Sequence, residues 1–286
     1  MKKVICKEDK KLNSFYSILS CECYGDFTIF NNGLKCVDCE KIIQKSNQDE
    51  PLVFEEVYTA PRKANKGIPL KEIKCGNWRS LNYNITQSWV DHLPNIDFLI
   101  DLGSGPLTNF ELLKEKNTIF IDGAKYDGID IVCNFSNQLP FKANSVDAIL
   151  CSNVFEHLSE PQKTFDEISR VLKTDGSVLI LVPFLIKIHQ EPFDFYRYTK
   201  HALKHLAQNS GLETIEIKEV GGFTNILESI FQIAIRETNH SIKRWFFKIQ
   251  YKILRILRKL YGDDPPDSSL PQGYAMFLTK KNKTSD

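Results

Sequence analysis

The sequence predicts an α/β fold with a doubly wound, mostly parallel sheet and a small cysteine-rich domain in front of it. Two observations support this prediction. From about residue 98 onward, apolar strand-like runs alternate with segments of helical periodicity, the order that places helices on both faces of a parallel sheet. Before residue 58, four of the eight cysteines fall between Cys21 and Cys39.

The sheet is expected to contain seven strands, each a short apolar run bounded by turn residues. They lie at 98–103, 118–123, 129–135, 146–153, 177–184, 213–220 and 273–281. Helical periodicity is found in the segment ending near His92, and at 108–116, 160–173 and 199–211. The run at 177–184 is almost entirely apolar, which is typical of a strand buried on both faces.

The first 57 residues are predicted to form a zinc-ribbon-like domain, 1–57. Two cysteine pairs flank an alternating segment whose turn is Asn31-Asn32-Gly33, a hairpin signal. This is the layout in which two knuckles hold one tetrahedral zinc ion. The expected ligands are Cys21, Cys23, Cys36 and Cys39.

The first cysteine pair departs from the usual zinc spacing, because it is C-x-C and not C-x-x-C. Cys6 could replace one of its thiols. The alternative interpretation is a metal-free small domain with buried cysteines. A linker is expected to follow, starting at residue 58.

Composition places the chain among ordinary globular proteins, with 42% apolar and 26% charged residues. The net charge of +1 provides no basic field and argues against nucleic acid as a partner. No run reaches the roughly 20 apolar residues of a transmembrane helix, and charges at 7–9 interrupt any signal-peptide core. We therefore expect a cytoplasmic protein whose cysteines are thiols or metal ligands.

A glycine-containing loop follows the strand at 98–103 and reads Asp101-Leu102-Gly103-Ser104-Gly105. Such a loop either makes a tight strand-to-helix turn or lets a nucleotide-like cofactor approach the backbone. Asp122 ends the next strand, nineteen positions after Gly103, at the spacing of a carboxylate that binds the ribose hydroxyls.

Several short motifs downstream of this loop resemble those of the class I S-adenosylmethionine-dependent methyltransferases. They are Leu139-Pro140-Phe141, Ser145-Val146-Asp147, Phe155-Glu156-His157-Leu158, Arg170-Val171-Leu172-Lys173, Asp175-Gly176 and Val182-Pro183-Phe184. The resemblance covers about residues 98–220 and implies a Rossmann-like seven-stranded methyltransferase sheet. It assigns 58–286 to a methyltransferase domain with a basic amphipathic helical insertion at about 223–268.

The resemblance also implies S-adenosyl-L-methionine as the cofactor. The residues expected to bind it are Asp101, Gly103, Gly105, Asp122, Asn134, Phe135 and Asn153. Two positions depart from the family pattern: Asn134 stands where an acid usually reads the adenine amino group, and Leu107 stands where a third glycine is common. An amide oxygen can still accept a hydrogen bond from that amino group.

The loop 189–199 is the expected border of the acceptor pocket, and it reads H-x-x-P-x-D-x-x-R-Y-T. We predict His189 as the general base, because a neutral imidazole can take a hydroxyl proton. Asp194 and Arg197 are expected to form a pair that shapes the lid. The alternative is a pair that only holds the loop, with Glu156 or His157 as the next candidates for the base.

Similar chains with this loop occur among bacterial methyltransferases of surface-polysaccharide assembly, which favours a saccharide or similar small acceptor. The alternatives are RNA methylation and a catalytically inactive protein that binds S-adenosylmethionine. The segment 241–261 alternates basic and large apolar residues and carries no acid. It is expected to form a helix that either contacts the inner face of a membrane peripherally or packs on the domain.

Overall fold

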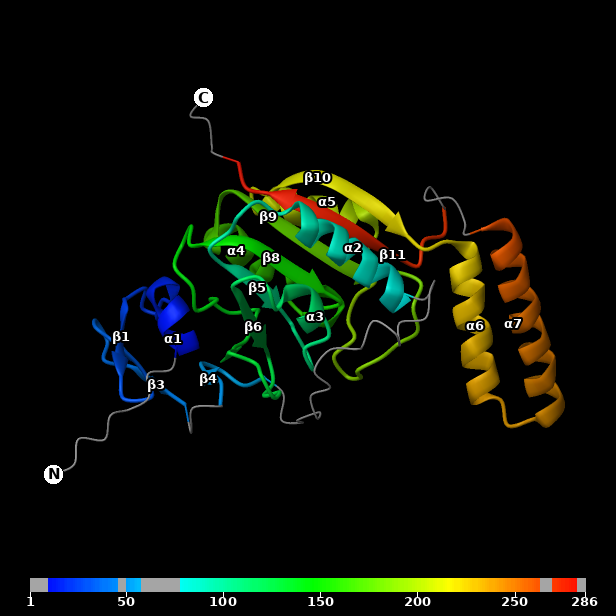
Figure 1. Ribbon diagram of the computed structural model, residues 1–286, viewed down its shortest axis with the longest axis horizontal. Coiled ribbons are helices and arrows are strands. Elements are labelled where there is room, and N and C mark those ends of the chain that lie inside the picture. The colour runs from blue at the N-terminus through cyan, green and yellow to red at the C-terminus, as the bar shows by residue number, and fades with distance from the viewer. Residues whose placement is uncertain (1–9, 46–49, 58–77, 263–268, 282–286) are drawn as a thin grey trace.

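The computed structural model describes residues 10–45, 50–57, 78–262 and 269–281, and an eight-stranded sheet forms its centre (Figure 1). The strand order is β10-β11-β9-β8-β5-β6-β7-β4. The strands are β4 (Leu52–Val53), β5 (Leu99–Leu102), β6 (Thr118–Asp122), β7 (Ile131–Val132), β8 (Val146–Ser152), β9 (Leu172–Pro183), β10 (Glu213–Val220) and β11 (Gly273–Thr279).

The sheet contains the seven predicted strands and one more, which corrects the expected number. Strands β4 to β9 pair in parallel, and β11 is antiparallel to both β9 and β10. The eighth strand, β4, comes from the segment assigned to the N-terminal domain and pairs with β7. A two-residue strand is too short to show a periodic pattern in the sequence. It forms because the outer edge of β7 offers unpaired backbone groups.

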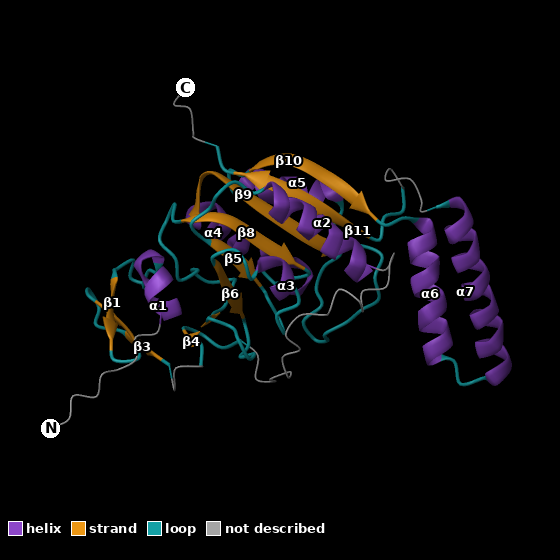
Figure 2. Ribbon diagram, viewed as in Figure 1, coloured by secondary structure: helices purple, strands orange, loops and turns teal. Residues whose placement is uncertain are grey.

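Helices cover both faces of the sheet, as predicted, because strand residues alternate between two cores. On one face α2 (Trp78–His92) and α3 (Phe110–Leu113) pack with Leu99. On the other face α4 (Pro161–Val171) and α5 (Lys200–Asn209) pack with Ile100. Figure 2 shows these helices as layers about the strands.

The N-terminal region forms a second, three-stranded sheet that shares its core with the large one. Helix α1 (Lys10–Phe15) and the 3-10 helix η1 (Tyr16–Ile18) precede β1 (Phe27–Phe30), β2 (Gly33–Cys36) and β3 (Ile42–Gln44). Strands β1 and β2 form the predicted hairpin, with Phe30 paired to Gly33. Phe15, Leu19 and Leu34 are buried in one cluster with the residues facing α4.

Two expectations for this region, the start of a linker at residue 58 and Cys6 as a substitute ligand, lie outside the described residues. The described part ends at Val57, whose N–H group donates to the carbonyl of Gly123 at 2.8 Å. The segment after β4 is therefore held against the end of β6.

A helical hairpin lies between β10 and β11 and consists of α6 (Phe223–Glu237) and α7 (Ser241–Tyr261). Figure 1 shows it at the opposite end of the molecule from β1 and β3. Glu228 on α6 accepts hydrogen bonds from Arg258 at 2.7 Å and from Tyr251 at 3.1 Å, both on α7. Among the described residues, none of the helices is long and apolar enough to cross a membrane.

Candidate functional site

The glycine loop after β5 has the backbone shape that its sequence predicts. Gly103 has φ +80°, and a Cβ atom there would lie 2.3 Å from Cγ2 of Val154. Gly105 has φ +54°, and a Cβ atom there would meet nothing within 4 Å. A side chain at Gly103 is therefore excluded by packing, whereas one at Gly105 would project into open space beside the loop.

The carboxylate of Asp122 joins this loop to the end of β6. Its Oδ2 accepts from the N–H of Gly105 at 2.7 Å, and its Oδ1 accepts from the N–H of Ala124 at 3.1 Å. Burial raises its pKa to about 6. The N–H of Gly123 also faces this carboxylate. Since a carboxylate offers about four acceptor positions, it can still accept from the hydroxyl groups of a ligand.

A cavity of about 380 Å³ lies against the glycine loop and Asp122. Its lining residues are Val57, Gly103, Gly105, Pro106, Asp122, Gly123, Tyr126, Phe135, Asn153, Val154, His157, Leu158, Gln190, Glu191 and Phe193. Five of the seven residues predicted to bind the cofactor are in this wall: the two glycines, Asp122, Phe135 and Asn153. The strand ends of a parallel sheet bring them together, as expected.

The other two predicted cofactor residues are not part of the cavity wall. Asp101 is buried beneath the loop, and burial raises the pKa of its carboxyl to about 7. Asn134 faces a neighbouring hollow, where its side-chain oxygen accepts from the N–H of Ser136 at 3.0 Å and its NH₂ group donates to Glu55 at 3.2 Å. The sequence placed Asn134 at the correct strand end, but local hydrogen bonds turn its side chain away.

Leu107, the residue at the position of a third glycine, is accommodated without filling the cavity. It has φ +55°, in the left-handed region that favours glycine. Its side chain is 2% exposed and packs in the core on the α2 side of the sheet, against Gly128. A leucine at this position therefore strains the backbone of the loop but leaves the space beside Gly105 open.

Sequence reasoning missed several residues that build or support the cavity. One of them is Trp78, whose indole N–H donates to the side-chain oxygen of the predicted residue Asn153 at 2.7 Å. Val57 and Tyr126 complete the wall. Tyr126 follows β6 closely and could have been found from its place after a strand, but nothing in the sequence indicates that Trp78 or Val57 reaches this edge.

The loop 189–199 is held by the predicted pair of Asp194 and Arg197. Two guanidinium nitrogens of Arg197 donate to the two Asp194 oxygens at 2.6 and 2.8 Å. These hydrogen bonds lower the pKa of Asp194 to about 2, and its side chain is only 2% exposed. Arg197 also donates to the carbonyls of Ile186 and Lys187, so the pair fixes the course of the loop.

His189 lies with Glu156 and His157 in one cluster at the edge of the cavity. Its Nε2 is 3.8 Å from Oε1 of Glu156, and Nε2 of His157 is 3.6 Å from the same oxygen. Glu156 is completely buried, and burial raises its pKa to about 8. Of the three, only His157 is among the residues that line the cavity.

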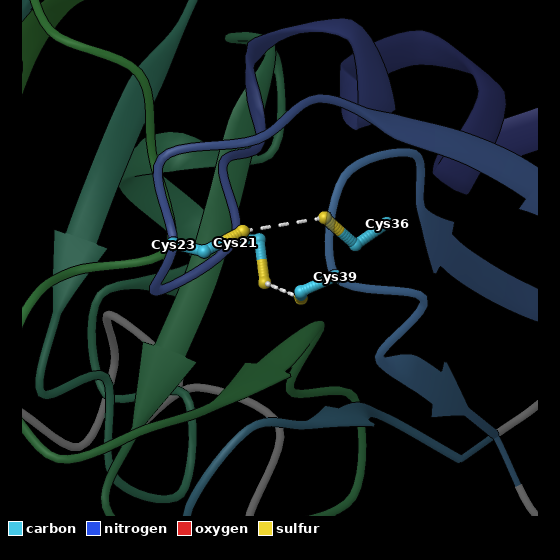
Figure 3. A group of neighbouring side chains, drawn as sticks. All are labelled: Cys21, Cys23, Cys36 and Cys39. Carbon is cyan, nitrogen blue, oxygen red and sulfur yellow. Dashed lines mark hydrogen bonds between the residues drawn. The ribbon is translucent and has the colours of Figure 1, made fainter.

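The four N-terminal cysteines converge on one point, as Figure 3 shows. The sulfurs of Cys21 and Cys39 are 3.5 Å apart, as are those of Cys23 and Cys36, and all four lie within 4.8 Å of one another. Sulfurs bound tetrahedrally at about 2.3 Å from zinc are about 3.8 Å apart. The C-x-C pair therefore reaches one centre despite its short spacing.

The backbone around the cysteine cluster is arranged to stabilise thiolates. The N–H group of Cys39 points at the sulfur of Cys36, and this hydrogen bond is the main reason that the Cys36 pKa is lowered to about 7. A Cβ atom on Gly25 would lie 2.8 Å from that same sulfur, so the glycine permits the close approach of the two loops. The donor set and its geometry fit a structural zinc ion.

The strand order, the bare loop after β5 and the acid after β6 define a Rossmann-like methyltransferase domain. Residues 99–180 match the family described as methyltransferase domain, which confirms the resemblance read from the motifs. The family match and the fold support S-adenosyl-L-methionine as the cofactor. The glycine loop, with its open space at Gly105, and the free acceptor positions of Asp122 fit such a ligand.

Two uncharacterized proteins of Methanocaldococcus jannaschii are similar to this chain. One is 37% identical over 136 residues, which make up 48% of this chain and 51% of that protein. The other is 32% identical over 107 residues, covering 36% of this chain and 50% of that protein. The chain thus spans about half the length of the curated relatives it matches.

A solved structure that matches the fold is the complex between the Haloferax volcanii Trm112 methyltransferase activator and a methyltransferase. The similarity has a TM-score of 0.51 and 15% identity, and it covers 73% of this chain and 92% of that chain. At this level of identity the comparison shows a shared fold alone.

Proposed function

We propose that the protein is an S-adenosylmethionine-dependent methyltransferase that methylates a hydroxyl group of a saccharide or similar small acceptor. The observation that carries this proposal is the cavity that joins the glycine loop, Asp122 and the segment from Gln190 to Phe193 in one wall. The residues proposed to bind the cofactor and the acceptor therefore line one cavity, as a direct transfer between two bound molecules requires.

In this proposal the chain aligns two reactants. When bound, S-adenosylmethionine supplies an electrophilic methyl group on a sulfonium sulfur. The backbone at Gly103 and Gly105 holds the amino-acid end of the cofactor, and Asp122 holds the ribose. The acceptor hydroxyl must lose its proton as its oxygen forms the bond to carbon and the sulfur–carbon bond breaks, and the titratable groups beside the cavity are Glu156, His157 and His189.

A saccharide acceptor is supported by the likeness of the 189–199 loop to polysaccharide methyltransferases and by the polar groups of that loop at the cavity. Gln190 and Glu191 line the wall and can hydrogen-bond to several hydroxyls. The RNA alternative has no comparable support in a chain of net charge +1. Leu107 and Asn134, the two departures from the family pattern, would favour the inactive alternative if they blocked the cofactor, but neither side chain obstructs the cavity.

Calorimetric titration with S-adenosylmethionine or its demethylated product tests the proposal. We expect Asp122→Ala to weaken binding more than tenfold, because two charge-assisted hydrogen bonds to the ribose are lost. Asp127→Ala is the matched control, since this exposed acid lies on the same connection and does not line the cavity. Transfer of a labelled methyl group to a panel of saccharides then tests the acceptor. Unchanged affinity in Asp122→Ala would remove Asp122 from the site.

We further propose that Cys21, Cys23, Cys36 and Cys39 bind one zinc ion that stabilises the ribbon. Cys21 and Cys36 are buried, whereas Cys23 and Cys39 are exposed. A sheet of three short strands has little apolar core of its own, so a bound metal ion would stabilise it. Because β4 and the shared core connect this region to the large sheet, zinc binding would stabilise the methyltransferase domain as well.

We also propose that α7 contacts an anionic membrane surface. Its residues Phe247, Leu254 and Arg258 are half-buried, at the spacing of one helix face, and Arg258 contacts α6. On another face of the helix, a stripe of large apolar residues remains exposed: Ile242, Trp245, Phe246, Ile249, Ile253, Ile256, Leu257 and Leu260. Trp245 alone is 65% exposed. The basic residues Arg244, Lys248, Lys252, Arg255 and Lys259 flank this stripe, as in helices that lie at a lipid interface.

Sedimentation with vesicles tests the membrane contact. We expect binding to vesicles that contain phosphatidylglycerol, weaker binding to pure phosphatidylcholine, and release by added salt, because salt screens the attraction. Lys248→Glu combined with Lys252→Glu should abolish binding, whereas Lys204→Glu on α5 should not. Binding that is independent of lipid charge and salt would contradict the proposal.

A further inference from the structure

Glu156, His157 and His189 form a second group of metal-ligand type, separate from the cysteines. Glu156 and His157 lie on the 3-10 helix η3 (Phe155–His157), which follows β8, and His189 comes from the loop after β9. One donor atom from each residue lies within 4.8 Å of the other two. The three side chains therefore surround a common point at the carboxyl ends of two adjacent strands.

The distances from Glu156 to the two histidines favour a shared cation over a hydrogen-bonded network. The 3.6 and 3.8 Å separations between Oε1 of Glu156 and the two histidine Nε2 atoms exceed the 2.7–3.2 Å of hydrogen bonds. Ligands bound tetrahedrally at about 2.1 Å from one ion are about 3.4 Å apart. The observed separations are within a few tenths of an ångström of that value.

The buried polar atoms of the group have no partner among the described residues. Both carboxylate oxygens of Glu156 and the Nε2 atom of His157 are buried without a hydrogen bond. An isolated buried carboxylate is costly unless a proton or a cation neutralises it. The nearby Arg197 does not fill that role, because its guanidinium is paired in bidentate fashion with Asp194.

Both imidazoles are oriented as metal ligands are. Nδ1 of His157 is 2.5 Å from the carbonyl oxygen of Phe193, so this nitrogen carries the proton and Nε2 carries the lone pair. Nδ1 of His189 lies 3.2 Å from the carbonyl of Lys187 and 3.5 Å from Oδ2 of Asp194. A carbonyl or carboxylate behind Nδ1 is the arrangement that fixes the tautomer of a histidine binding metal through Nε2.

We propose that Glu156, His157 and His189 bind one divalent transition-metal ion of the zinc type. Three protein ligands leave at least one coordination position open, and His157 brings that position to the cavity that it lines. A hydroxyl or water bound there would be more acidic than in solution. A role for this acidity in methyl transfer rests on the proposed function. The binding of the metal ion does not depend on that function. His189 then acts as a ligand and not as the general base.

The test compares metal content in the full chain and in variants of the three residues. Protein is stripped with chelator, loaded with Zn²⁺, freed of excess metal and analysed for metal per chain. We expect Glu156→Gln to hold one equivalent less than the wild type and to bind Zn²⁺ at this site at least tenfold more weakly. Glu160→Gln, which alters an exposed acid four residues away, should retain the wild-type amount.

A second variant covers the case that Glu156→Gln does not fold. The His189 side chain is 29% exposed, so His189→Asn leaves the core intact and should lose the same equivalent. Loading with Co²⁺ separates the two sites, because the thiolate charge-transfer absorption reports the cysteine cluster alone. Equal metal content in the wild type and both variants would overturn the inference. Affinity for the demethylated cofactor, measured on the same samples, tests the proposed function independently.

Discussion

Replacing Asp101 by asparagine should change how the stability of the cofactor-free protein depends on pH. Asp101 is 1% exposed, and burial raises the pKa of its carboxyl from 3.8 to about 7 in the folded chain. The folded state therefore holds a proton that the unfolded state has released between these two values. Over that range the free energy of unfolding falls as pH rises, and above about pH 7 the loss is complete.

The size of this effect follows from the shift in pKa. A shift of about three units corresponds to about 4 kcal/mol, since each unit is about 1.4 kcal/mol. Asparagine has nearly the same shape and does not ionise, so Asp101→Asn removes this contribution. The stability of the variant relative to wild type should therefore increase by up to about 4 kcal/mol between pH 4 and pH 8.

Urea unfolding at a series of pH values, followed by circular dichroism, measures this difference. Asp91→Asn is the control, because the carboxylate it removes is exposed on α2. A difference between Asp101→Asn and wild type that stays constant from pH 4 to pH 8 would refute the reasoning. In that case the buried carboxyl would not be the group that titrates.

Three further predictions concern the metal, the loop and the backbone. Cys36→Ser should lose one zinc per chain by elemental analysis and lower the melting temperature, because the ribbon shares the core of the large sheet. His189→Ala should lose turnover while calorimetry shows cofactor affinity near wild type, and Asp194→Ala should mainly raise the KM for the acceptor. Leu107→Gly should relieve the positive φ but destabilise the fold by about 2 kcal/mol in urea unfolding, since burial of the leucine is lost.

Most of the parallel sheet could be predicted because its strands carry local signals. The runs at β5, β6, β8 and β9 are apolar and bounded by turns, and Thr199 caps α5 through a hydrogen bond from the N–H of Ala202 at 3.2 Å. Strand β4 and helix α1 escaped prediction. A two-residue strand has no repeat, and its pairing partner is nearly 80 positions away in the sequence.

The parts of the site that depend on order along the chain could be predicted from the amino-acid sequence alone. Alternating strands and helices bring Gly103, Gly105 and Asp122 to one sheet edge, and two cysteine pairs around a hairpin bring four thiols together. Each of these follows from local backbone geometry and from the rule that parallel strands end at the same edge. The positions of these residues along the strands and the hairpin depend little on how distant side chains pack.

Which side chains face the cavity, and which buried charges lack a partner, depends on the packing of the whole fold. Asn134 stands at the predicted strand end but turns toward Glu55, and Asp101 becomes buried beneath the loop that it begins. His189 meets Glu156 across more than 30 positions because β8 and β9 are neighbours in the sheet. Burial and side-chain direction arise from packing among all the elements, and no local pattern in the sequence encodes them.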